Sequence, residues 1–229
     1  LTGFKNMEFV IEAIVEDEEI KKQTYKQLET VLNDNAIIAT NTSSISINKL
    51  ASELKNKENF IGVHFFNPVN LMPLVEVIPS QHTSKETIDK VLELLISCGK
   101  TPIVVGDCAG FIVNRILLPY LNEAAFILSE GSKIEHIDHL IKGFGMPMGP
   151  FTLADTVGVD IGYKVATILN ESYGSRMPIA SIIEKMYNAK LLGEKTKAGF
   201  YEYAGRDTYP NSHVTSMLEN NNKIIEDEE

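Results

Sequence analysis

One histidine and one glutamate interrupt the largely apolar stretch FIGVHFFNPVNLMPLVEVI, at residues 60–78. His64 is flanked by valine and phenylalanine, and Glu76 is flanked by two valines. Burying an ionisable group is costly unless a partner satisfies it. A carboxylate that binds an imidazole holds one tautomer and stabilises the imidazolium, which suits a general base near neutral pH. The two residues are therefore either a catalytic pair or two core polar groups that satisfy each other.

Other polar residues lie beside apolar segments in the same way. The run NTSS at 41–44 follows a short apolar strand, and Ser43 and Ser44 are either site residues or helix caps. Asn114 lies among apolar residues, where its amide could donate to a substrate carbonyl in an interdomain cleft or satisfy the backbone. Its neighbour Arg115 is expected to be a solvated helix charge rather than an anion contact.

The first half of the chain alternates apolar strands with amphipathic helices. The predicted strands are 9–15, 36–40, 60–66, 74–78 and 101–106, and the predicted helices are 17–34, 44–54 and 84–99. In the first helix Ile20, Leu28, Val31 and Leu32 recur at helical spacing. This alternation predicts a mostly parallel α/β sheet, which binds ligands beyond the carboxyl ends of its strands. A crossover between the third and fourth strands is expected to bring Glu76 to face His64.

After Gly106 the pattern becomes helical. The predicted helices are 109–131, 133–142, 150–157, 159–172 and 178–190, with Pro119 expected to kink the first and a short strand at 199–203. We therefore expect two domains, an α/β domain at residues 1–106 and an all-α domain at residues 107–229.

The composition argues against some classes of protein, and several motifs that resemble metal or phosphate sites do not hold up. The net charge of -10 argues against nucleic-acid binding. Cys98 and Cys108 form neither a disulfide framework nor a metal motif, which favours a reducing cytoplasm. His136 and His139 share a predicted helix face but are expected to be surface residues rather than metal ligands. The run GFGMPMG at 143–149 follows a helix, so it does not match a phosphate-binding loop, and no G-x-G-x-x-G occurs.

Several motifs in sequence order point to a known family. They are EAIVE, NTSS, GVHFFNPVNLMPLVEVI, GKTPIVV, GFIVNRILLPYLNEA and GMPMGPFTLADTVGVD. With them the chain resembles L-3-hydroxyacyl-CoA dehydrogenases of fatty-acid β-oxidation, and is most similar to the dehydrogenase segment of the multifunctional α subunit of the fatty-acid oxidation complex. The resemblance implies a partial Rossmann-type parallel sheet, the C-terminal half of an NAD-binding domain, at 1–106. It also implies that the helical domain at 107–229 forms a dimer interface.

The resemblance implies roles for individual residues. His64 would take the 3-hydroxyl proton of an L-3-hydroxyacyl-CoA substrate, with Glu76 as its orienting partner, while hydride passes from C3 to the nicotinamide. Ser43 matches a serine that contacts the substrate hydroxyl region, and Asn114 an asparagine at the substrate carbonyl. The positions implied near the nicotinamide and ribose of NAD are Glu16, Lys21, Asn41 and Asn67.

The sequence departs from the family at its start. The strand, glycine-rich turn, helix and acidic ribose contact expected before FVIEAI are absent from the 229 residues. We therefore expect a fragment of a longer enzyme, with little or no NAD-linked activity by itself. The alternative is a non-catalytic oligomerisation or assembly module of a larger complex. Expected partners are a second copy of the chain and a thiolase β subunit, whereas a His-Glu hydrolase is disfavoured because no G-x-S-x-G occurs.

Overall fold

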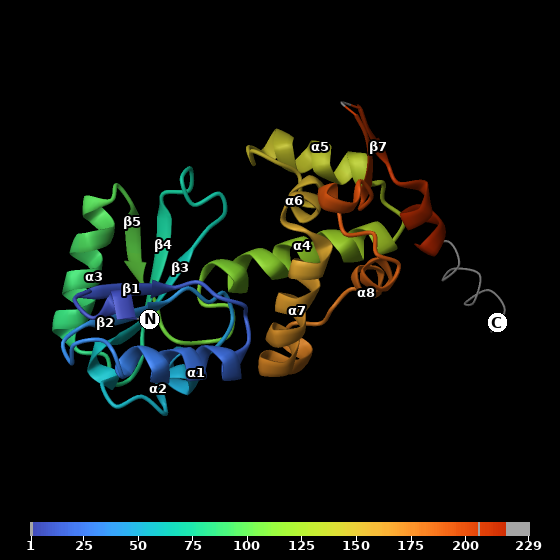
Figure 1. Ribbon diagram of the computed structural model, residues 1–229. Coiled ribbons are helices and arrows are strands. Elements are labelled where there is room, and N and C mark those ends of the chain that lie inside the picture. Colours follow the sequence, from blue (N-terminus) through green and yellow to red (C-terminus); the bar gives the residue numbers. More distant parts are fainter. Residues whose placement is uncertain (1, 206, 219–229) are drawn as a thin grey trace. The chain divides into compact units, whose positions relative to one another are not determined.

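Residues 2–205 and 207–218 are described by a computed structural model, in which the chain divides into two units, Leu1–Ile112 and Val113–Glu229 (Figure 1). The first unit contains a sheet of five strands in the order β1-β2-β3-β4-β5. The strands are β1 (Phe9–Glu12), β2 (Ile37–Thr40), β3 (Phe60–Phe65), β4 (Leu74–Pro79) and β5 (Thr101–Val104). β1, β2 and β3 are parallel, as are β4 and β5, which confirms the predicted α/β class with a mainly parallel sheet.

The connection between β3 and β4 differs from the prediction. The two strands are antiparallel neighbours, so the expected crossover between them is wrong. The intervening residues 66–73 are too few for a parallel crossover, which takes about a dozen residues or more. In the antiparallel register His64 lies directly opposite Glu76. Residues directly opposite on paired strands point to the same face, so the sheet itself brings the two side chains together.

Helices cover both faces of this sheet. α1 (Glu18–Glu29) and α2 (Ile47–Ala51) pack on one face through a cluster that includes Tyr25 and Leu50, and α3 (Lys85–Ser97) packs on the other through Val91. His64 shares its face with Phe60, a member of the α1/α2 cluster, because alternate strand residues point the same way. The catalytic candidates therefore lie on the side of the sheet covered by α1 and α2.

Capping residues explain where these helices begin. Asp17 accepts from the Ile20 amide at 3.0 Å, and Ser84 accepts from the Thr87 amide at 3.1 Å. α2 is shorter than expected and is capped by Ser46 rather than by Ser43 or Ser44. The two earlier serines therefore lie in the turn between β2 and α2.

Leu28 of α1 is buried and Leu32 just beyond the helix packs on the same core cluster, as their spacing suggested, but Ile20 does not face inward. Lys21, Tyr25 and Leu28 are buried, whereas Ile20 is 46% exposed. A helix can bury only one stripe of side chains. In α1 that stripe contains a lysine, since a buried carboxylate of β1 meets it there.

The second unit is mainly helical. It contains α4 (Val113–Ser129), α5 (Ile134–Phe144), α6 (Pro150–Val157), α7 (Val159–Tyr173), α8 (Ser181–Asn188) and an antiparallel hairpin of β6 (Tyr201–Ala204) and β7 (Asp207–Pro210). Residues 212–218 are also helical, and short 3₁₀ turns occupy Thr2–Phe4, Lys57–Asn59, Gly174–Arg176 and Glu194–Thr196. β6 is the strand expected at 199–203, whereas β7 was not predicted. Its sequence is DTYP and all four residues are exposed, so it lacks the alternation of apolar and polar residues that predicts a strand.

α4 begins later than predicted and contains Pro119 within its length. Gly110 and Phe111 have φ of 73° and 46°, a left-handed conformation that an α-helix cannot contain. The helix therefore starts at Val113. No helix in the described part of the chain is long and apolar enough to cross a membrane.

Candidate active site

His64 and Glu76 form a buried hydrogen-bonded pair. His64 Nδ1 lies 2.7 Å from Glu76 Oε2, with His64 7% exposed and Glu76 fully buried. The imidazole packs beside the ring of Phe66, at 4.6 Å between centroids, and of Phe111, at 5.9 Å. The other carboxylate oxygen of Glu76, Oε1, accepts from the Ile112 amide at 2.9 Å. Both oxygens of Glu76 are thus held, and the imidazole is fixed on three sides.

This geometry sets what the imidazole can do. With Nδ1–H donating to a carboxylate, the neutral ring presents Nε2 as a hydrogen-bond acceptor. When Nε2 takes a proton, the adjacent carboxylate stabilises the positive ring. The pair is therefore suited to general-base chemistry at Nε2 of His64.

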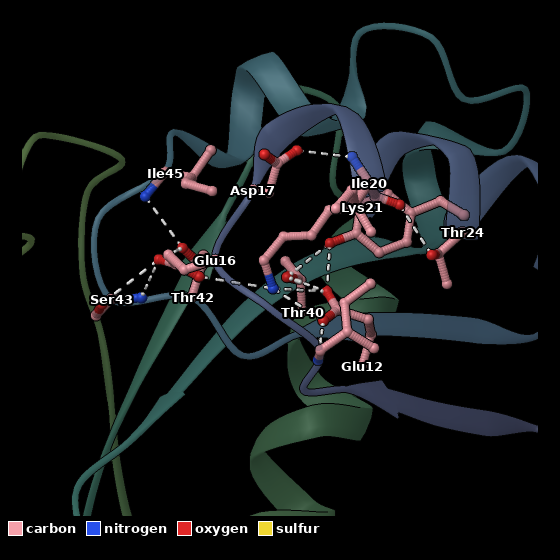
Figure 2. A network of polar contacts seen from close by, with 12 residues as sticks. Glu12, Glu16, Asp17, Ile20, Lys21, Thr24, Thr40, Thr42, Ser43 and Ile45 are labelled. Atoms are coloured by element: carbon pink, nitrogen blue, oxygen red, sulfur yellow. Dashed lines mark hydrogen bonds and ion pairs between the residues drawn. The ribbon is translucent and has the colours of Figure 1, made fainter.

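The turn after β2 is organised by Glu16 (Figure 2). Glu16 Oε1 accepts from the Thr42 hydroxyl at 2.5 Å and from the Ser43 amide at 3.0 Å. The hydroxyls of Ser43 and Ser44 lie 3.4 and 3.3 Å from the same oxygen. The exposed Glu16 carboxylate thus fixes the backbone that carries Ser43 at the carboxyl end of the parallel strands.

Beneath this turn lies an ion pair that the sequence analysis missed. Lys21 is fully buried, with Nζ 2.8 and 3.0 Å from the two carboxylate oxygens of Glu12 and 3.6 Å from Glu16 Oε2. Glu12 also accepts from the hydroxyls of Tyr25 and Thr40, at 2.5 and 2.8 Å. Lys21, predicted to contact the cofactor, is therefore bound inside the first unit. The glutamate in the apolar strand FVIEAIV was the available signal, of the same kind as Glu76 in LVEVI.

Opposing effects set the protonation of this network. Burial raises the pKa of Glu12, but hydrogen bonds from Lys21, Tyr25 and neighbouring groups outweigh it, so the pKa is lowered overall. Burial, followed by the hydrogen bond to the Glu12 carboxylate, raises the pKa of Tyr25 well above its usual range. Glu12 is thus an anion at neutral pH, and Tyr25 remains a hydrogen-bond donor.

The remaining predicted site residues lie in two places. Asn41 follows β2, and its side-chain oxygen accepts from the Phe65 amide at 3.2 Å, which links the ends of β2 and β3. Asn67 is exposed in the loop after β3. Asn114 belongs to the second unit, in the first turn of α4, where it is half-buried. Arg115 is exposed, as expected, and its guanidinium lies 5.1 Å from the centre of the Tyr173 ring.

Two residues predicted to be ordinary surface groups are exposed. His136 and His139 lie on α5 with solvent-exposed side chains. Within residues 2–205 and 207–218, no cluster of three or more histidine, cysteine, aspartate or glutamate side chains could hold a metal ion.

The second unit buries carboxylates of another kind. Asp138 accepts from the amides of Phe151 and Thr152 at 2.9 and 3.0 Å, and from the Tyr201 hydroxyl at 3.0 Å. Asp155 accepts from the amides of Phe200 and Tyr201, both at 2.9 Å, and from the Tyr203 hydroxyl at 2.9 Å. Burial raises the pKa of Asp155 to about 6, since hydrogen bonds only partly offset the desolvation. These acids join α5, α6 and the β6 hairpin.

The residues at the carboxyl ends of β1 and β2 fit part of a nicotinamide dinucleotide. Glu16 offers an exposed carboxylate, Ser43 a hydroxyl and Asn41 a side-chain amide, which are groups that bind ribose hydroxyls and a carboxamide. The sequence contains no G-x-G-x-x-G, so the fit concerns the nicotinamide end of the cofactor and not its pyrophosphate.

Known families and proteins match both units. Residues 1–108 match the 3-hydroxyacyl-CoA dehydrogenase NAD binding domain, and residues 110–203 match the C-terminal domain of 3-hydroxyacyl-CoA dehydrogenase. Fatty acid oxidation complex subunit alpha of Acinetobacter baylyi is 47% identical over 202 residues, 87% of this chain and 28% of that protein. The Vibrio campbellii subunit of that name is 46% identical over 217 residues, 95% of this chain and 31% of that protein. The chain thus spans roughly three tenths of the length of these relatives.

Solved structures share the fold. (S)-3-hydroxybutyryl-CoA dehydrogenase from Ralstonia eutropha superposes with a TM-score of 0.86 at 42% identity, covering 89% of this chain and 73% of that one. 3-Hydroxybutyryl-CoA dehydrogenase from Escherichia coli K12 gives a TM-score of 0.87 at 36% identity, covering 90% of this chain and 45% of that one.

Proposed function

Because the chain belongs to the 3-hydroxyacyl-CoA dehydrogenase family, we propose that it serves the NAD-dependent oxidation of L-3-hydroxyacyl-CoA to 3-ketoacyl-CoA. The observation that carries the proposal is the buried pair of His64 and Glu76, joined at 2.7 Å. A hydroxyl group can be oxidised by hydride loss only if its proton is also removed. The imidazole of His64 is the group in this unit that is built to remove it.

The chain's own residues have separable tasks in this reaction. His64 accepts the proton of the 3-hydroxyl at Nε2, and Glu76 stabilises the imidazolium that forms. Ser43 orients the substrate hydroxyl, and Asn114 donates to the substrate carbonyl. NAD, when bound, supplies the hydride acceptor at its nicotinamide. Glu16, Asn41 and Asn67 hold the nicotinamide and its ribose. Lys21 acts through Glu16, whose carboxylate lies within ion-pair range of its ammonium group.

A variant of the general base tests the proposal. In the full-length protein His64→Gln should lower turnover of 3-hydroxyacyl-CoA by about 10²–10⁴-fold, measured by NADH absorbance, because the proton acceptor is lost. The matched control is His213→Gln, which removes an exposed histidine in the helical residues 212–218 and should leave turnover unchanged. A His64→Gln enzyme that folds and retains wild-type turnover would rule out the general-base role.

We also propose that the protein acts in the cytoplasm as a homodimer through its helical unit, with a thiolase β subunit in the complete complex. Three observations support this. The curated relatives are named as subunits of a fatty acid oxidation complex. Exposed apolar side chains gather near the end of α5, where Phe144 is 86% exposed and Leu140, Met146 and Met148 accompany it. Both cysteines are free thiols, as in proteins of reducing compartments.

Sizing by sedimentation tests the assembly and separates the two functional candidates. A dimer that Phe144→Ser converts to a monomer supports an interface at α5. A dimer that binds no NAD and turns over no substrate in the full-length protein would favour the assembly-module alternative. A monomer at all concentrations would contradict the homodimer.

A further inference from the structure

The Glu12 carboxylate is the buried end of a polar network that reaches the exposed turn after β2 (Figure 2). Besides Lys21, Tyr25 and Thr40, it accepts from the Ile14 amide at 2.6 Å. Donors on both of its oxygens restrain this carboxylate. It therefore fixes the position of each of its donors.

Lys21 connects the buried Glu12 to the more exposed Glu16. Its ammonium group is fully buried and has both oxygens of Glu12 within 3.0 Å. On its other side Glu16 Oε2 lies at 3.6 Å, within ion-pair range. A buried ammonium attracts a carboxylate more strongly than a solvated one would, because little water screens the charge. The position of Lys21 therefore biases where the Glu16 carboxylate rests.

Glu16 in turn binds residues of the turn between β2 and α2. Its second oxygen, Oε1, accepts from the Thr42 hydroxyl and the Ser43 amide. Contacts run without interruption from Glu12 through Lys21 and Glu16 to Ser43. The buried Glu12 is at one end, and Ser43, a predicted site residue, is at the other.

The charge balance explains why Glu12 is needed. Two carboxylates share one ammonium, and Glu12 holds it with the shorter contacts. Without the negative charge on Glu12, Glu16 would become the carboxylate nearest to Lys21. Glu16 would then move toward Lys21 and away from the amide of Ser43.

We propose that Glu12 is a positioning residue of the site, which holds Lys21 in the core and thereby fixes the Glu16 carboxylate that orders the turn carrying Ser43. The inference rests on the proposed function only in that Glu16 and Ser43 serve cofactor and substrate. The contacts themselves can be tested without either ligand.

The test is the amide of Ser43 in the ligand-free protein. In Glu12→Gln its proton resonance should move upfield and its hydrogen exchange should accelerate at least about tenfold, as for loss of a hydrogen bond to a charged group. The Val63 amide in β3 is the internal reference and should exchange as in the wild type, because a general loss of stability would accelerate both. Glu29→Gln is the matched control, since Glu29, the last residue of α1, accepts from the amides of Lys55 and Asn56.

A second variant keeps the test decisive if Glu12→Gln does not fold. Glu12→Gln/Lys21→Met removes both charges of the buried pair, which is far less costly than leaving one unpaired. It should fold, and because the ammonium that lies 3.6 Å from Glu16 Oε2 is gone, the Glu16 carboxylate is no longer held and the Ser43 amide should again show the upfield shift and rapid exchange. A wild-type Ser43 amide in either folded variant would overturn the proposal. Because no ligand is present, this result is independent of any dehydrogenase assay.

Discussion

Glu76 in the first unit pairs with the imidazole of His64, whereas Asp155 in the second accepts from two backbone amides and a tyrosine hydroxyl. The same contrast separates Glu12, which binds the Lys21 ammonium, from Asp138, which binds amides and hydroxyls. Both kinds of carboxylate are buried and satisfied. They differ in whether the partner can itself carry charge.

This difference in partner indicates that Glu76 and Glu12 position groups of the candidate site, whereas Asp138 and Asp155 stabilise the fold. An imidazole partner can exchange a proton, and an ammonium partner can change position when a nearby charge changes. The pairs of His64 with Glu76 and of Lys21 with Glu12 both lie near the ends of strands in the sheet. Amide donors cannot do so, and Asp138 and Asp155 instead fix the start of α6 and the turn before β6. Substitution of Glu76 should therefore change chemistry more than stability, and substitution of Asp138 or Asp155 should do the reverse.

Removing Asp138 should give the largest effect on stability. Asp138→Ala leaves the buried amide of Phe151 and the hydroxyl of Tyr201 without their acceptor, so unfolding free energy should fall by about 3–5 kcal/mol. Urea denaturation measures this loss. Glu16→Gln, at an exposed carboxylate, is the control and should cost under about 1 kcal/mol. Equal losses of unfolding free energy in Asp138→Ala and Glu16→Gln would contradict a structural role for Asp138.

The pH dependence of stability should have opposite signs in the two units. Asp155 has its pKa raised from 3.8 to about 6, so the folded state holds its proton more tightly than the unfolded state. Its contribution is fully present below about pH 4 and is lost as pH rises to about 6, a change of about 3 kcal/mol. Glu12 has a lowered pKa, so its contribution is present above about pH 4.5 and is lost as pH falls.

Unfolding curves at several pH values measure both signs. The stability of the wild type relative to Asp155→Asn should decrease between pH 4 and 6, because only the wild type loses this contribution. Its stability relative to Glu12→Gln should decrease in the other direction, toward acid. Slopes of the same sign would show that the two acids are not opposed.

A smaller effect should follow from filling the space beside Asp155. A Cβ at Gly199 would lie 2.0 Å from Asp155 Oδ1 and 2.6 Å from the backbone Cα of Gly193. Gly199→Ala should lower unfolding free energy by about 1–3 kcal/mol through overpacking. Gly143→Ala, where nothing lies within 4 Å, is the matched control and should be neutral or slightly stabilising, since it lies within α5. A neutral Gly199→Ala would contradict the tight packing of Asp155.

The sequence pattern anticipated the parallel sheet, the helical second half and the apolar setting of His64 and Glu76. The antiparallel connection between β3 and β4 was missed, although the short segment 67–73 between the predicted strands is too short for a parallel crossover. The burial of Lys21 was also hidden, since helical periodicity favoured Ile20 as the inward residue. The carboxylate of Glu12 on the neighbouring strand, together with that of Glu16, makes a lysine stable there.

If the pair of His64 and Glu76 carries out proton transfer, Glu76→Gln should lower the turnover of the full-length protein. The glutamine oxygen can still accept from Ile112, but its amide would donate to Nδ1 and leave the proton of His64 on Nε2. Turnover per folded molecule should fall by roughly 10- to 100-fold, less than for His64→Gln, with a small change in unfolding free energy. Turnover within about twofold of the wild type, or a loss explained wholly by unfolding, would contradict the account.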